Sequence, residues 1–122
     1  MTAIASALRT RKISAVEVTQ ASLQRLKARG AEMNAVAGID EADALAQAER
    51  ADASDMSGPL AGVPLAHKDM YYRPGRISAC GSKIREDFMP DVLSGALKNL
   101  DNAGALDIAR LNMVCAASSM AT

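Results

Sequence analysis

The sequence predicts an α/β fold built on a mixed or parallel sheet. Stretches with apolar residues at helical spacing alternate with short apolar runs typical of strands, and glycine, proline or helix-capping residues separate them. The predicted order is helix, strand, helix, strand, loop, helix, strand, which is typical of α/β proteins. Of the 122 residues 49% are hydrophobic, but only two tyrosines and one phenylalanine are aromatic, so the core must be aliphatic. This length fits one domain or part of a larger one.

A short helix is expected over residues 3–9, and a well-marked helix follows it. Ser14 is a favourable N-cap residue, and Glu17 three positions later completes a capping box. The apolar residues of this second helix fall on one face. They are Val16, Leu23 and Leu26, with Thr19 between them. Gly30 is the expected end of the helix.

The next elements surround a lysine. Residues 35–39 are short and apolar, and they predict a buried strand. Asp40 is then placed to cap a helix over residues 41–53, where alanines and charged residues alternate at helical spacing. Residues 62–66 predict a second strand, and Lys68 lies just past its end.

The remaining part begins with a long irregular segment over residues 70–90, and such segments inside compact domains are often functional. Asp91 is expected to cap a third helix, which Gly104 ends. The buried side of this helix is expected at Leu93, Leu97 and Leu100. Residues 105–111 predict a last strand.

Composition excludes several functional classes. Fourteen basic and fourteen acidic residues are mixed along the chain and give a net charge of zero, so neither a nucleic-acid nor a membrane-surface partner is expected. Cys80 and Cys115 are too few for a disulfide framework or a zinc site. We see no signal peptide and no run of about 18 apolar residues, so we expect a cytoplasmic protein without a metal or cofactor.

Residues 58–69 read Gly-Pro-Leu-Ala-Gly-Val-Pro-Leu-Ala-His-Lys-Asp. This stretch resembles the amidase signature family, which reads Gly-Pro-Leu-x-Gly-(Val/Ile)-Pro, then a short apolar run, then Lys-Asp. Four further matches follow the family's order. They are residues 14–19, the Asn34-Ala35 strand with its following helix, Gly81-Ser82, and Ala103-Gly104-Ala105 with Asn112-Met113. The resemblance covers roughly residues 6–113, so we interpret residues 1–122 as an amino-terminal part of the family's α/β/α domain.

The resemblance implies a catalytic role for Lys68. The family hydrolyses amides with a Ser–cis-Ser–Lys triad, in which a neutral lysine accepts a proton through a bridging serine from a nucleophilic serine. A lysine acts as a base only when its pKa is lowered, by burial or by a nearby cation. The resemblance also suggests that Gly81 and Ser82 line the site, and a simple turn is the alternative. His67 is the only histidine, and we expect it to point to the face opposite Lys68.

The catalytic serines are the point of departure from the family. In the family the bridging serine belongs to a Gly-Gly-Ser-Ser-Gly-Gly-Ser stretch and the nucleophilic serine follows that stretch, and we expect both beyond Thr122. Residues 116–122 have a similar rhythm, but their glycines are replaced, so we do not assign Ser118 or Ser119 a catalytic role. We therefore expect that the 122-residue chain is inactive alone, and that it either belongs to a longer protein or associates with a second copy or a complementing chain.

The predicted function is hydrolysis of a small-molecule amide by the parent enzyme, a C–N hydrolase in which this chain carries the lysine. One alternative is the amidase component of a tRNA-dependent amidotransferase, which passes ammonia to a partner. Another is an inactive chain that acts as an interaction module.

Overall fold

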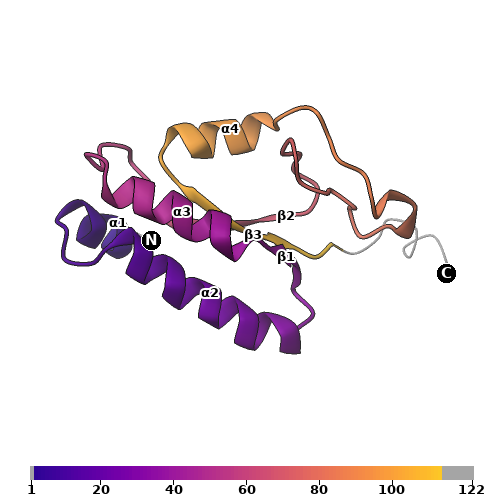
Figure 1. Cartoon of the computed structure of the whole chain (residues 1–122), viewed down its shortest axis with the longest axis horizontal. Helices are drawn as coiled ribbons and strands as arrows, with labels where there is room; N and C mark the ends of the chain where they lie inside the picture. The colour runs from indigo at the N-terminus through magenta and orange to yellow at the C-terminus, as the bar shows by residue number, and fades with distance from the viewer. Residues whose placement is uncertain (1, 114–122) are drawn as a thin grey trace.

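A computed structural model of the chain describes residues 2–113, and it has the α/β character that the sequence predicts (Figure 1). The helices of this part are α1 (Thr2–Arg9), α2 (Ala15–Glu32), α3 (Glu41–Asp52) and α4 (Gly95–Asn102). The strands are β1 (Val36–Ile39), β2 (Pro64–Lys68) and β3 (Leu106–Leu111). The segment between β2 and α4 is irregular, as expected, apart from a 3-10 turn at Lys83–Arg85. The predicted roles of Ser118, Ser119 and Cys115 concern residues outside the described part.

The sheet is small and mixed, as predicted. Its strand order is β1-β3-β2, and the central strand β3 runs antiparallel to β1 and parallel to β2. Near the start of β3, the pairing with β1 does not reach Asp107. The side chain of Gln47 on α3 forms hydrogen bonds with the main chain of Asp107 instead. Its amide nitrogen donates to the Asp107 carbonyl (3.3 Å), and its oxygen accepts from the Asp107 N–H (3.2 Å).

An aliphatic core joins the helices to the sheet. Helices α2 and α3 lie against each other, and they pack on the sheet, α2 on β2 and α3 on β3 (Figure 1). Thr19 and Leu23 of α2 are fully buried, and Val16 and Leu26 pack partly buried on the same side, which confirms the predicted face. The core residues buried from the other elements include Leu8, Ala44, Ala48, Val63, Leu106 and Ile108. No aromatic ring belongs to this core, as the composition predicts.

Helix α2 begins as predicted and ends later. The Ser14 side chain accepts a hydrogen bond from the Glu17 N–H, and the Glu17 side chain accepts one from the Ser14 N–H, which is the expected capping box. The prediction that Gly30 ends the helix is wrong, because α2 continues to Glu32. A Cβ at Gly30 would lie 2.5 Å from Cγ2 of Val36. The glycine therefore allows close packing between α2 and the strand that follows it.

Two other boundaries differ from the sequence prediction. Strand β2 begins at Pro64 rather than at residue 62, because Gly62 has φ +74° and lies in a turn, and Lys68 is its last residue. Asp91 does not cap α4, because the helix begins only after Ser94, whose N–H donates to the Tyr72 carbonyl.

The leucine pattern of this helix is correspondingly shifted. Leu97 is buried, with 1% of its surface exposed, whereas Leu93 precedes the helix and is 38% exposed. The contact between Tyr72 and Ser94 joins segments far apart in sequence, so no local pattern announces where α4 begins.

The position of Gly104 explains why α4 stops there. Gly104 has φ +86°, and a Cβ on it would lie 2.9 Å from the Cα of Ala61. We expect Gly104→Ala to lower the free energy of unfolding by about 2–4 kcal/mol. An alanine here would be strained by the left-handed backbone conformation, and its Cβ would overpack the contact with Ala61. Gly95→Ala is the matched control. A Cβ at Gly95 would meet no atom within 4 Å, so the stability of this variant should be unchanged or higher by up to about 1 kcal/mol. Equal urea midpoints for the two variants would contradict this account.

Candidate active site at the end of strand β2

Lys68 closes β2 and is exposed to solvent. The ladder with β3 continues to this residue, where Lys68 pairs with Leu111. The Lys68 carbonyl accepts hydrogen bonds from His67 Nδ1 (3.0 Å) and from the Tyr71 N–H (3.1 Å). Its ammonium group forms no hydrogen bond or ion pair with any residue in 2–113. The main chain of Lys68 is thus fixed, while its side chain is available for a group from elsewhere.

The neighbouring carboxylate of Asp69 is buried and organises the loop that follows. Its Oδ2 accepts hydrogen bonds from the N–H groups of Ala79 (3.1 Å) and Cys80 (3.2 Å), and its Oδ1 pairs with Arg110 of β3 (3.0 Å). The Asp69 carbonyl accepts from the Ser78 hydroxyl (2.8 Å). Asp69 therefore orients backbone and pairs with a cation, and it holds residues 78–80 beside the end of β2.

Gly81 and Ser82 lie in a tight turn just beyond these contacts. The Ser82 N–H donates to the Ala79 carbonyl (2.9 Å), and the two residues between them, Cys80 and Gly81, have φ values of +53° and +71°. Positive φ at both central positions favours glycine, which Gly81 supplies. Asp69 thus connects this turn to the strand that ends with Lys68. That Gly81 and Ser82 line a substrate site remains a prediction.

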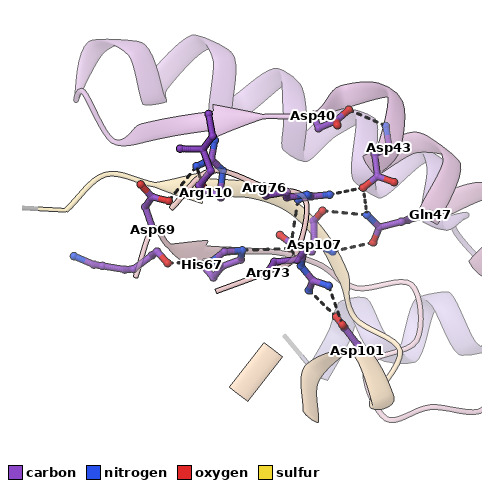
Figure 2. Close-up of polar contacts among 12 residues, drawn as sticks. Asp40, Asp43, Gln47, His67, Asp69, Arg73, Arg76, Asp101, Asp107 and Arg110 are labelled. Atoms are coloured by element: carbon purple, nitrogen blue, oxygen red, sulfur yellow. Dashed lines mark hydrogen bonds and ion pairs between the residues drawn. The ribbon is translucent and has the colours of Figure 1, made fainter. Parts of the chain in front are cut away.

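A second polar cluster lies on the buried side of the same strand (Figure 2). His67 is 6% exposed, unlike Lys68, which is consistent with opposite directions of neighbouring strand residues. Its Nε2 lies 3.2 Å from Oδ2 of Asp107 on β3, and both side chains are at least 95% buried. The rings of Tyr71 and His67 are nearly perpendicular, with their centres 6.3 Å apart.

Two arginines from the loop after Lys68 complete the cluster. Arg73 Nε lies 2.6 Å and Arg76 Nη1 lies 3.4 Å from the same oxygen of Asp107. Arg73 also forms two hydrogen bonds to Asp101 of α4 (2.9 and 2.8 Å), and Arg76 pairs with Asp43 of α3. Figure 2 shows these side chains converging on Asp107. The cluster joins residues 73–76 to α3, α4 and the centre of the sheet.

The surroundings of His67 and Asp107 shift both pKa values toward the charged forms. Burial opposes the charged form of His67, but the hydrogen bonds to Asp107 and to the Lys68 carbonyl outweigh it and raise the His67 pKa above its ordinary value. Burial likewise opposes ionised Asp107, but His67, Arg73 and Arg76 together hold the pKa of Asp107 below its ordinary value. Both shifts favour the ion pair.

The sequence analysis did not find this cluster, although one signal was present. Asp107 interrupts the apolar run of the last strand, and a carboxylate in a buried strand needs charged or hydrogen-bonding partners. The partners themselves were not visible, because His67 is forty residues away in the chain.

No group of three or more metal-ligating side chains occurs within the part of the chain that the structure describes. In that same part, no helix is both long and apolar enough to cross a membrane.

Comparison with known proteins assigns the fold to a class. The family model described as Amidase matches residues 17–122. The native peptide amidase from Stenotrophomonas maltophilia is similar over 91% of this chain and 24% of its own, with a TM-score of 0.82 and 27% identity. A bacterial aryl acylamidase of the amidase signature enzymes is similar over 89% of this chain and 24% of its own, with a TM-score of 0.81 and 25% identity.

These neighbours share the mixed α/β fold of amidase signature enzymes. The chain belongs to the amidase signature family. Among curated proteins, a glutamyl-tRNA(Gln) amidotransferase subunit of Azoarcus sp. (strain BH72) is 40% identical over 110 residues. That match covers 88% of this chain, and the chain spans 23% of the length of that relative.

Proposed function

We propose that Lys68 is the general base of an amide hydrolase. In this proposal, the bridging and nucleophilic serines of the family's Ser–cis-Ser–Lys triad come from outside residues 2–113. The nucleophilic serine attacks the amide carbonyl, and its proton passes through the bridging serine to Lys68. The C–N bond then breaks, the amine leaves with that proton, and water hydrolyses the acyl-serine to the acid and the free serine. The substrate is a small-molecule amide, and the chemistry needs neither a metal nor a cofactor.

The observation that carries this proposal is the setting of Lys68. Lys68 follows the family's Gly-Pro-Leu-Ala-Gly-Val-Pro motif and belongs to its Lys-Asp pair. It lies at the carboxyl end of β2, and no residue in 2–113 pairs with its ammonium group. In α/β proteins with parallel strands, ligands bind beyond this end of the strands. The Lys68 main chain is held by β3 and by His67, so the position from which the side chain extends is well defined.

The exposure of Lys68 sets a condition on the proposal. A lysine serves as a base only when its neutral form is populated, and burial favours that form. Because Lys68 is exposed in residues 2–113, the proposal requires that another segment or another chain covers it. In this proposal the cover is a further segment of the parent enzyme, a second copy of this chain or a complementing chain.

The test compares Lys68→Met with Lys83→Met in the full-length natural protein. We expect Lys68→Met to lower kcat/KM for a simple aryl or aliphatic amide by about 10²–10⁴-fold, as for the loss of a general base. Lys83 is exposed in the same irregular segment, so its replacement should leave the rate unchanged. Intact-mass spectrometry with a fluorophosphonate probe counts the nucleophilic serine. Full activity of Lys68→Met would contradict the proposal. A wild-type protein that neither hydrolyses amides nor takes up the probe would favour the interaction module.

A second candidate function is the amidase component of a tRNA-dependent amidotransferase. The amidotransferase relative from Azoarcus is 40% identical to this chain, against 27% for the peptide amidase, over similar shares of the chain. The same Lys68 chemistry would then release ammonia for transfer to an acceptor on a partner. Release of ammonia from glutamine that rises when the partner is added would support this candidate. Efficient hydrolysis of unrelated amides without a partner would favour the hydrolase.

Both functions fit the cytoplasmic location that the sequence predicts, which cell fractionation would test.

A further inference from the structure

The imidazole of His67 lies between two groups that only accept hydrogen bonds. Nδ1 is 3.0 Å from the Lys68 carbonyl oxygen, and Nε2 is 3.2 Å from Oδ2 of Asp107 (Figure 2). A carbonyl oxygen has no proton to give, and neither has an ionised carboxylate. Both ring nitrogens must therefore donate, and only the doubly protonated, positively charged imidazolium can do so.

The charges of the surrounding cluster lead to the same protonation state. Arg73 and Arg76 contact the Asp107 carboxylate, which keeps it ionised. Arg73 also pairs with Asp101, and Arg76 also pairs with Asp43. Two guanidinium groups thus face three carboxylates, and the imidazolium supplies the third positive charge. Asp101 and Asp43 are partly exposed, but Asp107 and His67 at the centre of the cluster are buried, and buried charges are much less costly when they are balanced.

The peptide group after Lys68 is held from both ends. Its oxygen accepts from His67, and its nitrogen, which belongs to Asp69, donates to the Leu111 carbonyl of β3 (3.0 Å). If His67 lost one proton, it would keep a single donor, and either the Lys68 carbonyl or Asp107 would lose its bond to the ring. The orientation of this peptide group determines where the Lys68 side chain begins.

We propose that His67 is a positioning residue that, as a charged imidazolium bridging Asp107 to the Lys68 carbonyl, fixes the main chain at the end of β2. Proton loss from His67 releases this bridge, so the position of Lys68 depends on pH. The groups that face the ring are the carboxylate of Asp107, the guanidinium of Arg73, which opposes the positive charge, and the neutral Tyr71 ring. The importance of Lys68 for catalysis rests on the proposed function, but the bridge itself does not.

The raised pKa of His67 and the lowered pKa of Asp107 agree with this arrangement. They indicate that the bridge persists to higher pH than a free histidine would allow.

Nuclear magnetic resonance of the isotope-labelled full chain tests the proposal directly. Long-range ¹H–¹⁵N spectra should show protons on both ring nitrogens of His67 at neutral pH. The midpoint of the His67 titration should lie above the ordinary value of about 6.5. The amide resonance of Asp69 should shift with the same midpoint, because its peptide group carries the bonded Lys68 carbonyl. An imidazole with one unprotonated nitrogen at neutral pH would overturn the proposal. So would an Asp69 amide resonance that does not shift as His67 titrates.

Two variants sharpen the measurement. Asp107→Asn should lower the His67 midpoint by about 1–3 pH units, because it removes the opposite charge at the ring. Asp101→Asn removes a carboxylate from the same cluster without touching His67, so it should change the midpoint much less. Equal effects of the two variants would contradict a specific bridge. The wild-type spectra decide the proposal even if a variant does not fold. None of these readouts uses catalysis, so failure of the lysine chemistry and failure of the bridge are separate results.

Discussion

Replacing Asp107 by alanine is expected to lower the free energy of unfolding by about 3–5 kcal/mol, the loss typical of breaking a buried ion pair. Asp107 is 3% exposed, and its carboxylate meets His67, Arg73 and Arg76. Without it, three buried or half-buried cations would face one another with no carboxylate between them. Urea denaturation followed by circular dichroism measures the difference between the variant and the wild type.

Asp101→Ala is the matched control for this experiment. Asp101 also pairs with Arg73, but its side chain is 36% exposed, so the expected loss is about 0.2–1 kcal/mol. If the two alanine variants lose the same stability, the burial of Asp107 does not determine its importance.

The stabilisation from Asp107 should also depend on pH in a defined direction. The pKa of His67 is raised by folding, so its contribution is complete below about pH 6.5 and is lost as the pH rises through the raised value. The pKa of Asp107 is lowered by folding, so its contribution is present above about pH 3.9 and is lost as the pH falls through the lowered value. The stability difference between wild type and Asp107→Ala should therefore be largest between these limits. A difference that grows above pH 6.5 would contradict the ion pair.

Asp69→Asn is expected to have a comparable effect on stability, about 3–5 kcal/mol. The substitution keeps the shape of the side chain but removes its charge and replaces one accepting oxygen with a donating NH₂ group. Either Arg110 or the N–H groups of Ala79 and Cys80 then face a donor instead of an acceptor. The turn that contains Gly81 should lose its attachment to the end of β2.

Amide hydrogen exchange provides the local measurement for Asp69→Asn. The amides of Ala79 and Cys80 should exchange faster in the variant than in the wild type, because a neutral amide oxygen accepts from them more weakly than the carboxylate does, and an NH₂ group does not accept at all. Asp87→Asn, at an exposed position of the same irregular segment, should change stability by no more than about 0.5 kcal/mol. Unchanged protection of both amides in Asp69→Asn would show that the carboxylate does not hold this loop.

Much of the fold was predictable because its signals are local. The capping box at Ser14 is a short-range pattern, and so are the Asp40 cap, the apolar face of α2 and the glycine at the end of α4. Each depends on residues within about one or two helical turns, so reading neighbouring positions is enough. The lysine motif is likewise contiguous, and it places Lys68 at the end of a strand without reference to the rest of the chain.

The wrong boundaries arose where a distant segment decides the local structure. Gly30 looks like a helix end, but it remains helical because β1 returns close to it and leaves no room for a side chain. Asp91 looks like a cap, but Tyr72 binds the main chain of Ser94 and the helix starts after that residue. In both cases a tertiary contact outweighs a local preference of about 1 kcal/mol.

The sequence by itself determined the α/β pattern, the aliphatic core and the lysine motif, because these depend on periodicity, composition and contiguous residues. Only the tertiary structure decided the surroundings of the lysine. It placed Asp107 against His67 and Arg110 against Asp69 by aligning β3 with β2, two strands that about forty residues separate. The pairing register brings these charges together, and low solvent exposure makes them matter, since charges attract more strongly where water is excluded.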